Sequence, residues 1–246
     1  MRVLAVIPAR YTSRRFPGKP LAPVAGRPLV QHVWERCRES EGVERIVIAT
    51  DDERIRKACL GFGAETELTN PDHASGTDRV AEISRRYPEY DVVLNVQGDE
   101  PGIAPSTITA VARAFRVSER QITTAVSPIR DETDKGNPNV VKVVTARDGD
   151  ALYFSRAAIP FRRTDSSGPP PVFYRHQGIY GFQRDVLQQV TTLPVTDLER
   201  AESLEQLRWL ENGFRIHCIV VSQCAVGVDT PADVPIVEHL LQAKGE

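Results

Sequence analysis

Short apolar runs and amphipathic segments follow one another in a regular order along the first half of the chain. The apolar runs predict strands at 3–7, 45–49, 91–96 and 122–127. Apolar residues three and four positions apart predict helices at 28–39, 52–60, 77–87 and 105–116. Strands that alternate with helices are typical of crossover connections on a largely parallel sheet. The pattern therefore predicts an α/β fold.

The order changes after residue 128. Two strand-like runs, 140–145 and 151–155, lie close together around Asp148-Gly149, which predicts an inserted antiparallel element. The serine-, glycine- and proline-rich segment 164–171 is predicted to be a mobile surface loop. Beyond it, the pattern predicts strands at 173–182 and 215–221, a helix at 198–210 and a closing helix at 231–243 capped by Thr230. We expect a single domain over residues 1–246.

Composition places the chain among ordinary globular proteins, with 246 residues, a net charge of −2 and 41% hydrophobic residues. The longest apolar run, 3–7, is far shorter than the roughly 20 residues of a membrane-spanning helix. The N-terminus shows no export signal, so we expect a cytoplasmic protein. The four cysteines form no metal-binding pattern and are interpreted as reduced thiols. Without an overall basic excess, no nucleic-acid partner is expected.

Positive charge gathers at the front of the chain. Residues 1–34 contain six basic residues and no acidic one: Arg2, Arg10, Arg14, Arg15, Lys19 and Arg27. Four of these lie in the sequence PARYTSRRFPGKP, which follows the first predicted strand. Ligands of open α/β sheets bind outside the carboxyl ends of the strands, so this loop is interpreted as a cradle for a triphosphate. It lacks the spacing of a Walker loop, and a solvated basic loop remains the alternative.

Carboxylates occur at two further strand ends. Asp99 and Glu100 follow the predicted strand 91–96 in NVQGDEP, and Asp229 lies between a short apolar run and the closing helix in GVDTPADV. Facing a basic loop, such carboxylates suit Mg²⁺ held by one or two protein oxygens and by substrate phosphates. Each aspartate taken alone also fits a helix cap or a turn.

Weaker signals come from three other places. Ser75-Gly76 opens a predicted helix, which favours either an anion or simple capping. In RHQGIYG, strand alternation puts His176 and Tyr180 on one face, which fits a polyhydroxylated acidic ligand or a half-buried sheet face. Glu205 is expected to form an exposed pair with Arg208.

Taken together, these sequences resemble the 3-deoxy-manno-octulosonate cytidylyltransferases, also called CMP-Kdo synthetases. The resemblance runs from end to end through PARYTSRRFPGKP, DHASGTDR, NVQGDEP, NPNVVKVV, ALYFSRAAIP, RHQGIYGF, LERAESLEQLR and GVDTPADV. It implies a Rossmann-like nucleotidyltransferase fold with an inserted region at about 130–195 for sugar binding and dimer contact. It also implies that CTP and 3-deoxy-manno-octulosonate (Kdo) react with Mg²⁺ to give CMP-Kdo and pyrophosphate for lipopolysaccharide synthesis, in a homodimer.

The resemblance also assigns roles to individual residues. It implies nucleotide contacts at Pro8, Ala9, Arg10, Arg15, Lys19, Ser75 and Gly76. It implies sugar contacts at Gln97, Arg156, His176, Tyr180 and Glu205. The metal would bind Asp99 and Asp229, and the catalytic residues would be Arg10, Lys19 and Asp99. The sequence departs from the family pattern at Phe16, Ala74, Gln177 and Phe182, which leaves the sugar open.

The expected mechanism is direct displacement at the α-phosphorus of CTP by the anomeric hydroxyl, with no covalent enzyme intermediate. A site rich in basic residues and metal fits such a transfer, which needs positioning and charge neutralisation more than a protein nucleophile. Two alternatives remain. The sugar acid can be a relative, such as the 8-amino octulosonate or a sialic acid, or the chain can be a nucleotide-binding paralogue without turnover.

Overall fold

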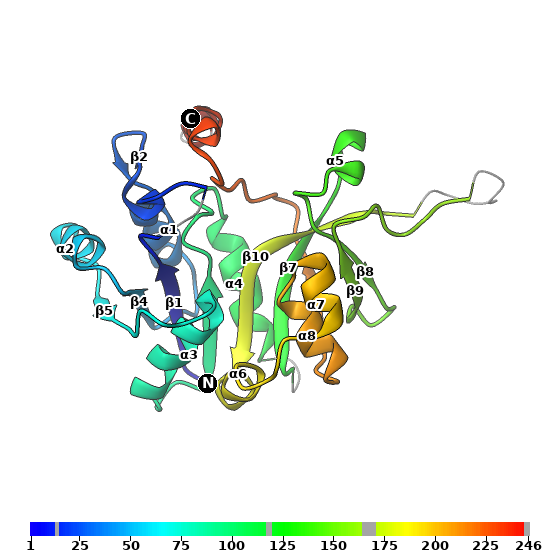
Figure 1. The fold of residues 1–246 in the computed structure, drawn as a ribbon, viewed down its shortest axis with the longest axis horizontal. Helices are drawn as coiled ribbons and strands as arrows, with labels where there is room; N and C mark the ends of the chain where they lie inside the picture. The colour runs from blue at the N-terminus through cyan, green and yellow to red at the C-terminus, as the bar shows by residue number, and fades with distance from the viewer. Residues whose placement is uncertain (13–14, 117–119, 164–170, 244–246) are drawn as a thin grey trace.

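The computed structural model of the chain is built around one large β-sheet. It describes residues 1–12, 15–116, 120–163 and 171–243. Within these ranges the sheet has nine strands, seven of them in the order β11-β7-β10-β6-β1-β4-β5, while β8 pairs with β10 and β9 pairs with β8 (Figure 1). The strands are β1 (Val3–Ala9), β4 (Arg45–Thr50), β5 (Thr66–Leu68), β6 (Val92–Val96), β7 (Ile122–Pro128), β8 (Lys142–Thr145), β9 (Ala151–Ser155), β10 (Tyr174–Gln183) and β11 (Ile216–Val220).

Most neighbouring strands run parallel. Strand β1 pairs in parallel with β4 and β6, and β11 pairs in parallel with β7. Strand β10 runs antiparallel between β6 and β7 and also pairs with the β8–β9 hairpin. The expected α/β fold with an inserted antiparallel element is confirmed.

Helices cover both faces of the sheet (Figure 1). They are α1 (Leu29–Arg38), α2 (Glu53–Gly61), α3 (Gly76–Arg86), α4 (Pro105–Ala114), α5 (Glu132–Gly136), α6 (Arg184–Val190), α7 (Asp197–Glu202), α8 (Gln206–Glu211) and α9 (Val234–Ala243). Alternate residues of β1 enter different cores: Leu4 and Val6 pack with α3, α6 and α8, whereas Ala5 and Ile7 pack with α1, α2 and α4. Two buried layers therefore hold the strand from which the basic loop emerges.

A third, smaller apolar cluster lies apart from these two cores. It joins Val24, on the short hairpin of β2 (Pro23–Val24) and β3 (Arg27–Pro28), to Leu29, Val228 and Val237. The backbone N–H of Ala25 also donates to Glu238 of α9, at 2.6 Å. The front of the chain and its C-terminal helix are thus packed on one another.

One predicted helix is wrong. The segment 198–210 forms two short helices, α7 and α8, because Ser203 between them adopts a left-handed backbone with φ 52°. Arg156 donates hydrogen bonds to the carbonyl oxygens of Glu202 and Ser203, which end α7. The closing helix starts with a 3₁₀ turn, Pro231–Asp233, before α9. Most of the predicted loop 164–171 lies outside the described residues, as does Arg14.

None of the described helices is long and apolar enough to cross a membrane.

Candidate active site

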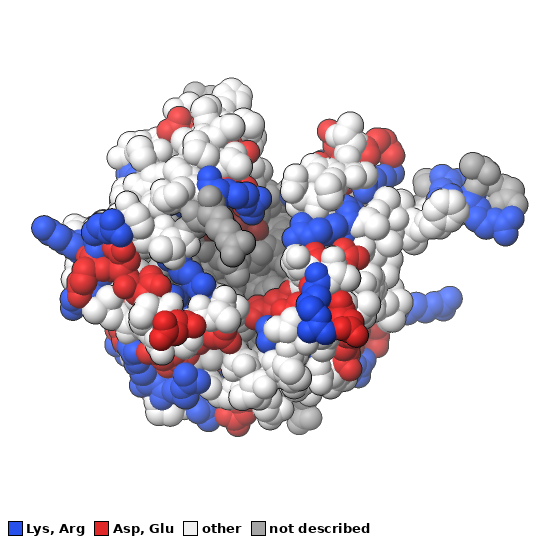
Figure 2. All heavy atoms as spheres, in the orientation of Figure 1, with Lys and Arg blue, Asp and Glu red and all other residues white. Residues whose placement is uncertain are grey.

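The loops after β1 and β6 meet the start of α3 at one edge of the sheet. They enclose a cavity of about 330 Å³ that the segment before α9 completes. Figure 2 shows this face hollowed at its centre, with Lys and Arg side chains on the rim. The lining includes these predicted site residues: Pro8, Ala9, Arg10, Arg15, Lys19, Ser75, Gly76, Gln97, Asp99 and Asp229. The structure therefore brings the predicted phosphate and metal residues together.

Arg10 ties the basic loop to the segment before α3. Its Nη2 donates to the carbonyl oxygen of Ser75 at 2.6 Å, and its Nη1 donates to that of Ala74 at 3.4 Å. The loop itself is closed by a hydrogen bond from the Gly18 N–H to the Tyr11 carbonyl, at 2.8 Å. Gly18 has φ +72°, a conformation that favours glycine. These contacts fix the backbone around the cavity.

Ser75 caps α3 while it lines the cavity. Its Oγ accepts from the Asp78 N–H at 3.1 Å, and the Asp78 carboxylate accepts from the Ser75 N–H at 2.9 Å. The capping alternative is therefore correct for the Ser75 side chain. Gly76 lies against Pro8, since a Cβ at position 76 would approach the proline ring to 3.4 Å.

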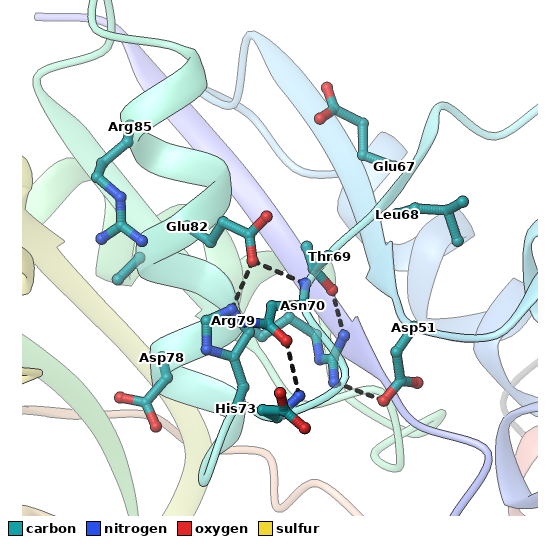
Figure 3. Close-up of polar contacts among 12 residues, drawn as sticks. Asp51, Glu67, Leu68, Thr69, Asn70, His73, Asp78, Arg79, Glu82 and Arg85 are labelled. Carbon is teal, nitrogen blue, oxygen red and sulfur yellow. Dashed lines mark hydrogen bonds and ion pairs between the residues drawn. The ribbon is translucent and has the colours of Figure 1, made fainter.

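A network behind this turn holds the segment 69–75 in place (Figure 3). The guanidinium of Arg79, which is fully buried, bonds to Thr69 and pairs with Asp51 at 2.9 Å. The Glu82 carboxylate accepts from the Asn70 N–H at 2.9 Å and contacts His73 Nε2 at 2.5 Å. Burial lowers the pKa of Arg79, and Asp51 opposes that shift. This anchoring role of Arg79 was not predicted from the sequence, although the motif DHASGTDR contains the residue.

Asp99 and Asp229 converge on the ammonium of Lys19. The Lys19 Nζ lies 2.6 Å from Asp99 Oδ2 and 3.7 Å from Asp229 Oδ1, and it donates to the Val228 carbonyl at 2.6 Å. Arg15 Nη2 pairs with Asp229 at 3.1 Å. Two acids far apart in the sequence therefore face the same point.

This pair of carboxylates fits the ligand preference of Mg²⁺, which takes few protein oxygens when phosphates and water supply the rest. In the part of the chain that the structure describes, no group of three His, Cys, Asp or Glu side chains forms a metal cage. Asp99 and Asp229 would hold such an ion together with phosphate and water oxygens.

A second cavity, of about 770 Å³, adjoins the first and shares Arg15, Gln97, Asp99 and Asp229 with it. It also brings together the other residues of the predicted sugar site, namely Arg156, His176, Tyr180 and Glu205. Arg175, on the same strand as His176, lines it as well and pairs with Asp134 at 3.3 Å. The bulge in β10 between His176 and Tyr180 keeps both rings together, with centroids 5.0 Å apart.

The polar groups on the sugar side are shielded from water. Burial lowers the pKa of His176 to about 3, so its ring is neutral, and its Nε2 lies 2.9 Å from Thr124 Oγ1. The buried hydroxyl of Tyr180 has no hydrogen-bond partner among the described residues, and burial raises its pKa. A buried hydroxyl without a partner is costly in a folded protein, so this one calls for an explanation.

Glu205 corrects one prediction. It does pair with Arg208, at 2.9 Å, but its side chain is only 25% exposed and is not the exposed pair that helical spacing suggested. It also accepts a hydrogen bond from Thr77 Oγ1 at 2.5 Å, across the site. Burial raises the pKa of Glu205, while the hydrogen bond from Thr77 and the charge of Arg208 lower it. Glu205 thus links α8 to the start of α3.

The fold is that of a nucleotidyltransferase. A family model described as "Cytidylyltransferase" matches residues 4–216. The chain is 47% identical to the 3-deoxy-manno-octulosonate cytidylyltransferase of Myxococcus xanthus, over 99% of this chain and 98% of that protein. It is 48% identical to the one from Synechococcus elongatus (strain ATCC 33912 / PCC 7942 / FACHB-805), over 95% and 96%. The chain therefore belongs to the 3-deoxy-manno-octulosonate cytidylyltransferase family.

Solved structures support this family assignment. A CMP:2-keto-3-deoxy-manno-octonic acid synthetase complexed with CTP superposes with a TM-score of 0.93 at 40% identity, covering 99% of this chain and all of the other. The 4-diphosphocytidyl-2C-methyl-D-erythritol synthase from Anaerococcus prevotii DSM 20548 shares only the fold, with a TM-score of 0.63 at 14% identity. That match covers 98% of each chain.

Proposed function

We propose that the protein transfers CMP from CTP to the anomeric hydroxyl of Kdo, giving CMP-Kdo and pyrophosphate. The observation that carries this proposal is the junction of the two cavities at Arg15, Gln97, Asp99 and Asp229. A triphosphate among the basic residues and a sugar beside His176 would meet there. The names of the similar proteins and the CTP in the similar structure support the choice of substrates.

In the reaction, a bond forms between the anomeric oxygen of the sugar and the α-phosphorus. The bond from the α-phosphorus to the oxygen shared with the β-phosphorus breaks, and pyrophosphate leaves with the electron pair. The hydroxyl proton passes to solvent. No protein nucleophile is needed.

The basic residues neutralise the phosphates in this scheme. Lys19 and Arg15 lie next to the two acids and would contact the triphosphate, while Arg10 holds the turn around Ser75. Fixed charges of this kind stabilise the charge that develops on the transferring and departing phosphates. Asp99 and Asp229 would hold Mg²⁺, which supplies charge neutralisation and lowers the pKa of a bound hydroxyl.

The sugar-side residues orient the acceptor. The free Tyr180 hydroxyl, the neutral His176 ring and the carboxylate of Glu205 offer partners to sugar hydroxyls. Gln97 lies where the two cavities meet, and Arg156 is held by the carbonyl oxygens of Glu202 and Pro138 at 2.7 and 2.9 Å. Such positioning is a major part of catalysis when two bound substrates react.

Further parts of the proposal concern the surroundings of the enzyme. All four cysteines are free thiols, which supports a reducing compartment such as the cytoplasm. A homodimer formed through the inserted region is supported by exposed apolar side chains there, Leu152 at 63% and Phe161 at 86%. The product would serve lipopolysaccharide synthesis, without a nucleic-acid partner.

The test is pyrophosphate release from CTP with each of three acceptors, Kdo, its 8-amino relative and a sialic acid, with Mg²⁺ and with a chelator. We expect turnover with Kdo that stops when the metal is removed and returns when Mg²⁺ is restored. Preference for another acceptor would reassign the substrate. CTP binding without pyrophosphate release would identify a paralogue that has lost turnover.

A further inference from the structure

The side chain of Glu100 lines the second, sugar-side cavity, and no step above uses it. Its Oε1 accepts a hydrogen bond from the Gly178 N–H of β10 at 2.8 Å. Its Oε2 is buried, and no described residue bonds to it. Burial raises the pKa of Glu100 to about 7, and the charge of Asp99 adds to the shift. The sequence groups Glu100 with Asp99, yet the structure directs it toward the sugar strand.

Strand β10 lies directly on this loop at Gly178. The Gln97 N–H donates to the Gly178 carbonyl at 3.1 Å, so both backbone groups of residue 178 bond to the loop. A Cβ at position 178 would lie 2.4 Å from Glu100 Oε1 and 3.0 Å from Gln97 Cγ. A side chain at position 178 would displace the Glu100 carboxyl from this place, and Gly178 stands inside the bulge between His176 and Tyr180.

The opposite side of the loop contacts the segment that carries the second acid. The Val228 N–H donates to the Asp99 carbonyl at 2.9 Å. A Cβ at Gly227 would approach that carbonyl to 3.3 Å and Glu100 Cγ to 3.7 Å. The loop is therefore held between the bulge of β10 and the segment that leads to Asp229.

We propose that Glu100 is a positioning residue that fixes the bulge of β10 to the loop bearing Asp99, and so sets His176 and Tyr180 relative to the reacting phosphorus. This inference rests on the proposed function. Only one carboxyl oxygen is bonded, so an amide at position 100 keeps the contact with Gly178. A methyl group there leaves a shielded N–H without a partner, which misplaces the sugar-side residues.

The test compares Glu100→Ala with Glu100→Gln. We expect Glu100→Ala to raise the KM for Kdo about tenfold or more and to leave the Kd for CTP, measured without sugar, within about twofold. Glu100→Gln should restore the KM to within about threefold of the original. Asp150→Asn is the matched control, because Asp150 is a shielded carboxylate bonded to His217 and Arg215 away from both cavities.

Three results would overturn the proposal. The first is an unchanged KM for Kdo in Glu100→Ala. The second is an equal loss of CTP affinity in that variant, because Glu100 would then stabilise the whole loop. The third is a Glu100→Gln variant as impaired as Glu100→Ala, which would mean that the acid itself is required.

Hydrogen exchange at the Gly178 amide tests the contact without any substrate. Protection should persist in Glu100→Gln and fall in Glu100→Ala, even if the original protein turns over no sugar acid, so that a failure of the proposed function is distinguishable. A double-mutant cycle with Gly178→Ala adds a second measure. Because the added methyl group collides with the Glu100 carboxyl, the double variant should bind Kdo no worse than Gly178→Ala alone. Additive losses would count against the proposal.

Discussion

On the nucleotide side of the site, charged groups already neutralise one another, whereas on the sugar side shielded polar groups are left without full partners. Lys19 is bonded to Asp99, and the Asp229 side chain, 52% exposed, pairs with Arg15. The Tyr180 hydroxyl instead is buried and unbonded within the described chain. On the nucleotide side, we expect phosphates and a metal ion to replace the ion pairs that Lys19 and Arg15 form with the two acids. On the sugar side, we expect a bound sugar to form hydrogen bonds that the protein alone does not form. Substitutions should therefore separate effects on CTP from effects on the sugar.

The largest effect is expected at the acids. Asp99→Asn removes a charge from the pair that faces Lys19, and turnover at saturating Mg²⁺ should fall about a thousandfold. Thermal unfolding should be little changed, because the Asp99 side chain is 36% exposed. Asp185→Asn, at a remote exposed ion pair, is the control. Near-normal pyrophosphate release by Asp99→Asn would show that Asp99 does not bind a catalytic metal ion.

A smaller loss is expected when the cation between the acids is removed. Lys19→Ala should reduce kcat/KM for CTP about a hundredfold, because one fixed positive charge on the phosphates is lost. The KM for Kdo should stay close to its original value if the two regions are independent. Lys57→Ala, at an exposed position of α2, serves for comparison. Equal changes in both substrates would show that Lys19 also organises the sugar side.

The sugar side should respond in the opposite way. Tyr180→Phe removes a hydroxyl that has no partner among the described residues, so stability should be unchanged or slightly higher. The Kd for Kdo should rise about tenfold, while the Kd for CTP stays constant. Calorimetry with each substrate measures both, and Tyr153→Phe on β9 is the control. Unchanged Kdo affinity would exclude a hydrogen bond from Tyr180 to the sugar.

The smallest effect concerns pH and stability. The pKa of His176 in the folded protein is about 3, below its unfolded value near 6.5, so only the unfolded chain binds a proton between these values. The free energy of unfolding should therefore contain a term that falls as pH drops below about 6.5. His176→Phe should remove that term, which denaturant unfolding at several pH values would measure. Parallel curves for the two proteins would show that His176 does not contribute.

Much of this arrangement follows from the sequence, because the carboxyl ends of parallel strands must lie at one edge. That rule joins Arg10 after β1 with Asp99 after β6. The rule does not predict the break between α7 and α8. The sequence there has an unbroken helical periodicity, but Ser203 adopts a left-handed backbone conformation. The rule also does not predict the hydrogen bond between Glu100 and Gly178, because a contact at a bulge depends on how distant strands pack.

The position of each predicted site residue is one question, and its role in binding or catalysis is another. The structure gathers the predicted residues around two cavities. Their contacts with CTP, Kdo and Mg²⁺ remain predictions that the variants above address.

The small cluster around Val24, Val228 and Val237 has a consequence for how substitutions are tolerated. It packs the basic loop against the segment that carries the second acid, Asp229, and it lies apart from the two large cores of the sheet. We expect substitutions in the two large cores to lower the free energy of unfolding, whereas substitutions in the small cluster should displace the basic loop and the second acid at a smaller cost in stability. A screen for thermal robustness alone would therefore pass chains that are well folded and inert.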